Sequence, residues 1–234
     1  MKKINQVPLN RALSKLGVLS RSQATDAILA GRVRVDGRVV RTPTAPVVPE
    51  KARIELDGAR AARAPWRTIV FHKPRGVVTT RSDPEGRRTI YDVLGDAGEG
   101  LVAVGRLDLA TSGLLILTSD TQLADWLTDP VNEVPRLYVV TVRGRVETGD
   151  VERLPGTVTV RKASGRETHL LVELREGKNR QVRRMFSDIG REVTSLKRVR
   201  VGRLDLGSLM PGEHREILRR DIAKAFPGAP RGEV

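Results

Sequence analysis

The hexapeptide VGRLDL occurs twice in this chain, at Val104–Leu109 and at Val201–Leu206, and each copy carries one aspartate. A carboxylate can act as a nucleophile or as a general base when its surroundings keep it ionised. Asp108 and Asp205 are therefore the first candidates for chemistry. The residues around the two copies share nothing further, so we treat the repetition as coincidence.

The two aspartates lie in different local patterns. Asp108 is flanked by Gly105 and Gly113 and leads into the apolar stretch GLLILT, so it lies near a strand end, where a polar group can face a cleft. Asp205 alternates with leucines, which predicts a strand with Asp205 facing solvent. Asp108 is thus the better candidate for a catalyst, although turn and capping roles are commoner for such an acid.

Other reactive groups form no recognisable arrangement. The histidines His72, His169 and His214 are far apart in the sequence and lack the paired spacing of metal ligands. No phosphate-binding or dinucleotide-binding glycine motif is found. The chain has no cysteine, which removes thiolate chemistry and fits a reducing compartment such as the cytoplasm. We therefore expect neither a metal nor a cofactor.

The charge of the chain favours a polyanionic partner. There are 42 Lys and Arg against 28 Asp and Glu, a formal net charge of +14, and arginine outnumbers lysine 33 to 9. Nucleic acid is the first candidate for such a surplus, and an anionic membrane is the weaker one, because no long basic amphipathic helix is apparent. An arginine excess of this kind also arises from codon composition.

The first quarter of the chain reads as a separate basic module. Residues 1–64 hold 13 Lys and Arg against 5 Asp and Glu, a net +8, whereas the other 170 residues have a net +6. Spacing predicts two short helices, the second opening at Ser20, followed by a hairpin that turns at Asp36-Gly37. We predict a module over 1–58 and a linker over 59–66. Its exposed basic candidates for nucleic-acid contact are Arg11, Lys15, Arg21, Arg32 and Arg34.

The larger segment, 67–225, mixes strand-like and helix-like stretches without a regular alternation. Strands are predicted in IVFHKP, GVVTT, GLLILT, RLYVVTVRG and THLLVELREG, and an amphipathic helix capped by Asn179 is predicted in NRQVRRMFSDIG. This pattern indicates an α+β fold with a mixed, largely antiparallel sheet. The end of the chain, 226–234, reads as a flexible tail.

Two family resemblances follow from these motifs. The stretch RALSKLGVLSRSQATDAILAGRVRVDGRVV resembles the small RNA-binding module named after ribosomal protein S-four. The motifs FHKPRGVVTT, VGRLDLATSGLLILTSD, RLYVVTVRG and LREGKNRQVRRMF, in this order, resemble the ribosomal RNA pseudouridine synthases of the small-subunit type. The resemblance implies an isomerase that needs no cofactor and acts on ribosomal RNA or a ribosome-assembly intermediate.

The resemblance also assigns roles to individual residues. It implies that Asp108 is the nucleophile, that Tyr138 packs on the target base and that Arg183 pairs with Asp108. Arg106 would hold open the position of the flipped base, and Leu196 would line its pocket. The further residues expected to contact RNA are Lys73, Asn179, Arg180, Gln181 and Arg184. For Arg180 and Arg184, a solvated helix face is the alternative.

The target is less closely defined by the sequence. The stretch TTRSDPEGRRTIYDVL resembles the large-subunit branch of the family, which slightly favours a uridine of the large ribosomal subunit, and the small subunit is the alternative. A non-enzymatic RNA-binding or ribosome-assembly factor is a second reading, which the basic front module supports. We expect a monomeric cytoplasmic protein that does not bind membranes.

Overall fold

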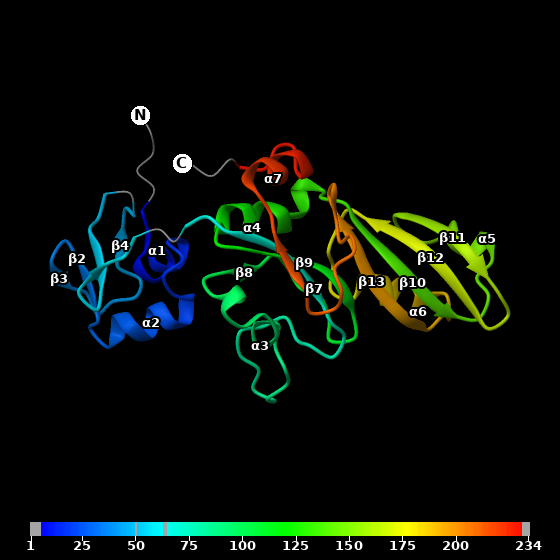
Figure 1. Cartoon of the computed structure of the whole chain (residues 1–234), viewed down its shortest axis with the longest axis horizontal. Helices are drawn as coiled ribbons and strands as arrows, with labels where there is room; N and C mark the ends of the chain where they lie inside the picture. The colour runs from blue at the N-terminus through cyan, green and yellow to red at the C-terminus, as the bar shows by residue number, and fades with distance from the viewer. Residues whose placement is uncertain (1–5, 50, 63–64, 231–234) are drawn as a thin grey trace. The chain divides into compact units, whose positions relative to one another are not determined.

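The computed structural model describes residues 6–49, 51–62 and 65–230, which form two compact units. One unit holds residues up to Trp66 together with Ser119–Thr121, and the other holds Arg67–Thr118 and the residues from Gln122 onward. The predicted α+β fold with a mixed, largely antiparallel sheet is confirmed (Figure 1).

The first unit packs two short helices against small sheets. Its elements are β1 (Val7–Pro8), α1 (Leu9–Lys15), α2 (Arg21–Leu29), β2 (Val33–Val35), β3 (Arg38–Val39), β4 (Pro46–Val47), β5 (Ile54–Leu56) and β6 (Ala59–Arg60). The predicted cap is present: Ser20 accepts a hydrogen bond from the backbone of Gln23, and the Gln23 side chain accepts one from Ser20. Apolar side chains from both helices, including Leu9, Leu13 and Ile28, form the core.

The turn and the boundary of this unit depend on local chemistry. Asp36 and Gly37 both have positive φ, 50° and 80°, as a two-residue hairpin turn requires, so the predicted turn is confirmed. Strand β6 occupies the first residues of the predicted linker and pairs with β5. The sheet therefore continues past residue 58. Residues 63–64 lie outside the described part of the chain.

The second unit is built on one sheet in the order β11-β12-β10-β13-β9-β7-β15. Its strands are β7 (Thr68–Lys73), β8 (Val102–Ala103), β9 (Ser112–Thr118), β10 (Arg136–Arg143), β11 (Thr157–Ala163), β12 (Glu167–Leu174), β13 (Val193–Val201), β14 (Leu204–Asp205) and β15 (His214–Glu216). Neighbouring strands are antiparallel except β9 and β13, which run parallel. This parallel pair joins the two halves of the sheet.

Helices cover the sheet and create two core clusters. They are α3 (Ile90–Leu94), α4 (Thr121–Thr128), α5 (Thr148–Val151), α6 (Gln181–Asp188) and α7 (Arg219–Ala225), with 3-10 turns η1 (Gly95–Gly98) and η2 (Pro130–Asn132). In Figure 1, α3 and α6 lie below the sheet and α4 and α7 lie above it. The α3 cluster contains Phe71 and Leu115, and the α6 cluster contains Val140 and Phe186.

Several sequence predictions for this unit need correction. GVVTT, predicted as a strand, is a loop, in which Val78 makes only an isolated bridge to Thr89. Strand β11 was not predicted. Phe226, placed in the predicted tail, is buried at 3% exposure against the backbone of Gly202. Residues 231–234 lie outside the described chain.

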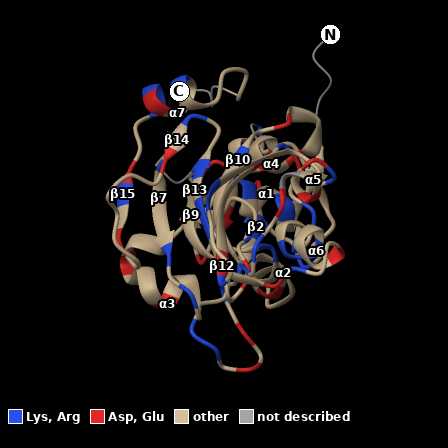
Figure 2. Ribbon diagram, turned by 90° about the vertical axis from the view of Figure 1, so that its right-hand side faces the viewer, with Lys and Arg blue, Asp and Glu red and all other residues tan. Residues whose placement is uncertain are grey.

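The loop that precedes α3 projects from the second unit and carries both signs of charge (Figure 2). It contains Arg81, Arg87 and Arg88 together with Asp83 and Glu85. The Asp83 carboxylate accepts two hydrogen bonds from the Arg87 guanidinium and one from the Arg87 backbone. A bidentate pair of this kind fixes the loop geometry.

Candidate active site

The segment Leu107–Thr111 carries Asp108, and each of its five backbone carbonyl oxygens accepts a hydrogen bond. The donors are Thr79 Oγ1 to Leu107 (2.8 Å), Lys73 Nζ to Asp108 (3.2 Å) and Thr111 (3.0 Å), Gly76 N to Leu109 (2.8 Å) and Arg183 Nη2 to Ala110 (3.2 Å). These donors come from β7, the loop after it and α6. The backbone around the carboxylate is therefore held from several directions.

Lys73 is the central support of this segment. Its side chain is fully buried, and its ammonium group also donates to the carbonyl of Pro74 at 2.9 Å. Burial lowers the pKa of Lys73 from 10.5 to about 8, and the nearby Asp108 charge opposes this shift. We expected Lys73 to contact RNA. That expectation does not fit a side chain without exposed surface, and its role here is to support the loop.

Thr79 supports the same segment from the other side. Its hydroxyl donates to the Leu107 carbonyl at 2.8 Å and accepts from the Leu107 amide at 3.2 Å. Sequence reasoning missed this residue because GVVTT reads as a strand, in which a threonine hydroxyl carries no special meaning. No local signal connects Thr79 with a residue 28 positions later.

The Asp108 side chain is 31% exposed and lies close to a group of arginines. Arg180 Nη1 lies 3.8 Å from Asp108 Oδ2. Arg183 donates to the backbone carbonyls of Val193 at 3.0 Å and Ala110 at 3.2 Å. Burial lowers the pKa of Arg183, the charges of Arg180 and Arg75 lower it further, and Asp108 opposes them. Asp108 thus has one guanidinium within ion-pair distance, that of Arg180, while Arg183 interacts with the charges of both Asp108 and Arg180.

This arrangement corrects the expected pairing of Arg183 with Asp108. Arg183 lies in the first turn of α6, as predicted, and interacts electrostatically with Asp108. Its guanidinium, however, donates its hydrogen bonds to backbone carbonyl oxygens. The arginine within ion-pair distance of Asp108 is Arg180. Arg180 therefore lies beside the Asp108 carboxylate, whereas Arg183 supports the backbone of the same segment through Ala110.

The start of α6 differs from the prediction as well. Its N-cap is Arg180, with a left-handed backbone (φ 48°), and not Asn179, whose side chain is exposed. The Gln181 side chain accepts from the Lys178 amide and donates to the Glu176 carboxylate. Gln181, expected to contact RNA, therefore closes the turn that leads into α6.

Tyr138 and the nucleophile segment are connected through one row of the sheet. Gly113 pairs with Lys73 on one side and with Arg198 on the other, and Arg198 pairs with Tyr138. Two strand spacings, about 10 Å, separate Gly113 from Tyr138. Tyr138 is partly buried and packs on the α6 cluster. Its place is compatible both with packing in the core and with the expected contact to the target base.

Gly113 allows β9 and β13 to approach. Its φ is +114°, and a Cβ atom there would lie 2.1 Å from the carbonyl oxygen and 2.6 Å from the amide nitrogen of Arg198. Arg198 is itself buried, and its Nε donates to the Leu114 carbonyl at 2.8 Å. This buried arginine was not identified from the sequence, where it resembles the surrounding surface charges.

Of the remaining predicted residues in the second unit, Leu196 is buried and the charged ones are exposed. Leu196 is 5% exposed and belongs to the α6 core cluster beside Val140, so its place is a packed core next to Tyr138. Arg106 and Arg184 are exposed. Asp205 is exposed and pairs with Arg200 at 2.6 Å, between the buried leucines of its strand, as predicted.

The first unit presents most of its predicted basic residues on the surface. Arg11, Arg21 and Arg34 are exposed, and Lys15 is half-buried. Arg32 is exposed but bound to Asp57 through two hydrogen bonds of 2.8 and 2.5 Å. Its guanidinium is therefore less available to a phosphate than those of Arg11 and Arg21.

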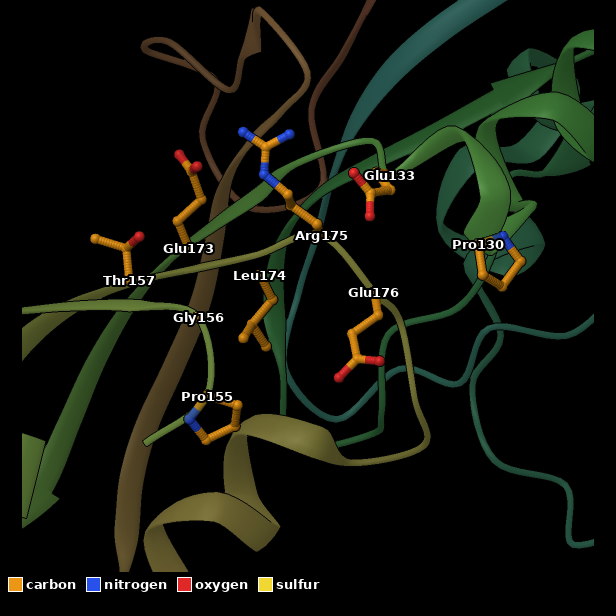
Figure 3. A pocket seen from close by; sticks show the side chains of 9 residues that line it. All are labelled: Pro130, Glu133, Pro155, Gly156, Thr157, Glu173, Leu174, Arg175 and Glu176. Carbon is orange, nitrogen blue, oxygen red and sulfur yellow. The ribbon is translucent and has the colours of Figure 1, made fainter. Parts of the chain in front are cut away.

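A cavity of about 360 Å³ lies elsewhere on the second unit, between η2, the turn before β11 and the end of β12 (Figure 3). Its charged lining is mainly acidic: Glu133, Glu173 and Glu176 against Arg175. Asp108 does not line it. Carboxylates repel phosphate, so this cavity does not suit an RNA backbone.

The described part of the chain contains neither a candidate metal site nor a membrane-spanning helix. No group of three or more His, Asp or Glu side chains in 6–49, 51–62 and 65–230 is placed to hold a metal ion. Within the same ranges, no helix has the length and apolar character needed to cross a membrane.

Comparison with known proteins gives consistent matches for both units. Residues 67–188 match the family model of RNA pseudouridylate synthase, and residues 7–51 match the S4 domain. An uncharacterized RNA pseudouridine synthase of Aquifex aeolicus (strain VF5) is 35% identical, with 94% of each chain covered. Ribosomal large subunit pseudouridine synthase B of Bacillus subtilis (strain 168) is 32% identical, covering 96% of this chain and 98% of the relative.

A solved structure agrees with these matches. The crystal structure of a pseudouridylate synthase superposes with a TM-score of 0.63 at 27% identity, covering 94% of this chain and 99% of the other. Among the sequence relatives, two longer proteins from Xanthomonas are covered over 44% and 48% of their length. The chain thus spans about half the length of those two relatives and nearly all of the others described.

Proposed function

Because the chain belongs to the RNA pseudouridylate synthase family, we propose that it converts a uridine of ribosomal RNA to pseudouridine with Asp108 as the nucleophile. The family match confirms the resemblance inferred from the four motifs. The large ribosomal subunit is the favoured target, since the Bacillus subtilis relative is named as a large subunit enzyme. A small-subunit uridine is the alternative.

The observation that carries this proposal is the support of the Asp108 segment. Five carbonyl oxygens are bound while the carboxylate is partly exposed and near Arg180. A nucleophile is most effective when its backbone is held and its charge is maintained. A surface aspartate in an ordinary turn needs no such network, so the geometry favours chemistry at Asp108.

The proposed reaction needs no net oxidation or hydrolysis. The carboxylate of Asp108 attacks C1′ of the ribose as the bond to N1 breaks, and the freed uracil turns. Its C5 then bonds to C1′ and displaces the carboxylate, C5 loses its proton, and N1 gains one. Tyr138, partly buried beside the α6 cluster, would contact the base. The uridine must first leave its stack, which costs about a few kcal/mol.

The S4 domain supports RNA binding by the first unit, which supplies exposed Arg11 and Arg21. Phosphate contacts of this kind position an enzyme on structured RNA and offset the cost of extruding a nucleotide. We further propose that the protein is a cytoplasmic monomer that meets its RNA in a ribosome-assembly intermediate.

The test is mapping of pseudouridine on large- and small-subunit RNA transcripts incubated with purified protein. Carbodiimide adducts and primer extension would locate new sites. Wild type should modify one or a few uridines, and Asp108→Asn should form no product while it still binds RNA. Asp205→Asn, in the second hexapeptide, is the matched control and should retain activity. Wild type that binds RNA without product would favour a non-enzymatic assembly factor.

A further inference from the structure

Arg180 and Arg183 approach Asp108 in different ways. The Arg183 guanidinium is fixed by the carbonyls of Val193 and Ala110. Arg180 makes a looser contact: its Nη1 lies 3.8 Å from Asp108 Oδ2, which is longer than the 2.7–2.9 Å typical of a charge-assisted hydrogen bond. The Arg180 side chain is 54% exposed. Arg183 is therefore a fixed support, whereas Arg180 can leave the carboxylate without breaking a backbone contact of its side chain.

The backbone of Arg180 is held in an unfavourable conformation. Its φ of 48° and ψ of 30° lie in the left-handed region, which residues other than glycine rarely adopt. Gln181 holds this turn through its bonds to Lys178 and Glu176. Such strain persists where the surroundings impose it. Here it places an exposed cation at the N-terminus of α6, 3.8 Å from the Asp108 carboxylate.

The charge balance leaves cations available for an anion. The charges of Arg75, Arg180 and Asp108 all act on Arg183, and Arg180 lies 3.8 Å from the Asp108 carboxylate. The positive charges in this group outnumber the single negative charge of Asp108 in the absence of RNA. A guanidinium binds phosphate well, because its planar N–H donors match two oxygens at once. Arg75 and Arg180 are both exposed, and Arg180 is the one within 3.8 Å of the Asp108 carboxylate, so it is best placed to exchange that carboxylate for a phosphate of the RNA backbone.

We propose that Arg180 shields the Asp108 carboxylate in the RNA-free protein and exchanges it for a phosphate of the RNA strand at the target uridine. This inference rests on the proposed function, because it assigns an RNA phosphate to the same site. Arg180 is then a substrate-positioning residue. When Arg180 moves from Asp108 to the phosphate, the protein binds the RNA backbone and exposes the nucleophile in the same step. The guanidinium also offsets the repulsion between the carboxylate and the incoming phosphates.

A double-mutant cycle tests the exchange. RNA affinity is measured by filter binding to unmodified large-subunit RNA transcript for wild type, Asp108→Asn, Arg180→Gln and the double variant. Because Asp108→Asn frees Arg180, it should tighten binding about two- to fivefold, the range of an exposed ion pair. In the Arg180→Gln background, the same change should leave affinity unaltered. If the gain persists there, it reflects general loss of negative charge, and the proposal is wrong.

Arg184→Gln is the matched control, since Arg184 is an exposed arginine one turn further along α6. In that background, Asp108→Asn should still tighten binding. Arg180→Gly is a second variant, because glycine accepts the left-handed backbone without strain and lacks the guanidinium. It should behave like Arg180→Gln. A gain that survives in Arg180→Gly would overturn the proposal even if the glutamine variant folds poorly.

Shielding is measured separately on the free protein. Carbodiimide and glycine ethyl ester label accessible carboxylates, and mass spectrometry gives the labelling rate of Asp108. The rate should rise about two- to fivefold in Arg180→Gln and stay unchanged in Arg184→Gln. Equal rates in wild type and Arg180→Gln would contradict the proposal. Neither measurement requires turnover, so failure to form pseudouridine would count against the proposed function and leave both results interpretable.

Discussion

The ammonium group of Lys73 donates a hydrogen bond of 3.2 Å to the backbone carbonyl of Asp108. The same nitrogen lies 3.0 Å from the carbonyl of Thr111, at the other end of the short turn. Lys73 is the last residue of β7, so one buried side chain joins the central sheet to the candidate nucleophile. The contact is made to the backbone, and it leaves the Asp108 carboxylate free for chemistry.

Replacing Lys73 with methionine should reduce turnover with little change in RNA affinity. Methionine has a similar length but no donor, so the carbonyls of Asp108 and Thr111 lose their partner. A displacement of about 1 Å at a reacting group can lower the rate on the order of 100-fold. Single-turnover assays should show a rate lower by roughly 10- to 100-fold, because Asp108 would be displaced by a similar distance. Lys162→Met, at an exposed position of β11, is the control, and equal losses would contradict the assignment.

The stability contributed by Lys73 should depend on pH in a defined window. Its pKa is about 8 in the folded protein and 10.5 ordinarily, so between these values the unfolded chain binds a proton that the folded chain does not. The free energy of unfolding should therefore rise with pH from 8 to 10.5 relative to Lys73→Met, by roughly 3 kcal/mol. Below pH 8 the difference should be constant. Urea unfolding of both proteins at pH 7, 8, 9 and 10 measures it, and a flat difference would exclude the shift.

Thr79→Val should weaken the second support of the segment. Valine has nearly the same shape, but the two hydrogen bonds between the Thr79 hydroxyl and Leu107 are lost. Each is worth about 0.5–1.5 kcal/mol, so unfolding should become easier by roughly 1–3 kcal/mol. Turnover should fall less than in Lys73→Met, because Leu107 is one residue away from Asp108. Thr159→Val, on exposed β11, should change neither quantity. A silent Thr79→Val would show that Leu107 needs no anchor.

Local patterns identified many of the elements that position the site. The capping pair of Ser20 and Gln23, the alternation of β12 and the apolar stripe of α6 are each contained within about ten residues. Such signals depend on the period of the element itself. Strand β11 lacks that signal because it is an edge strand with most residues exposed. Its valines and threonines alternate without marking a buried face.

The contacts that define the site were not predictable in the same way. Lys73 and Arg198 look like surface cations in the sequence, yet both are buried and bind carbonyls of segments far away in the chain. The choice between Arg180 and Arg183 as the partner of Asp108 depends on a left-handed residue at the start of α6. A shift of one residue in the helix cap changes the directions of the Arg180 and Arg183 side chains. Sequence spacing does not fix the first residue of a helix to that precision.

Gly113→Ala should destabilise the protein strongly and abolish activity. The added Cβ would overlap the Arg198 backbone at 2.1 Å, so β9 and β13 cannot keep their spacing. Together with the positive φ, this should cost more than about 3 kcal/mol. Gly105→Ala is the control: φ is +70° there, but the nearest atom is Thr128 Cγ2 at 3.6 Å, so about 1–2 kcal/mol of strain is expected. Urea unfolding compares them, and equal losses would refute the close approach.

Exposed arginines of the first unit should set part of the salt dependence of RNA binding. Each phosphate contact steepens the plot of log affinity against log salt by about 0.7–0.9, so Arg11→Gln with Arg21→Gln should make it shallower by roughly 1.4–1.8. The control, Arg153→Gln with Arg161→Gln, removes the same charge from exposed positions of the second unit. It should leave the slope nearly unchanged. Equal flattening in both double variants would mean that net charge, and not the S4 domain, determines how this protein holds RNA.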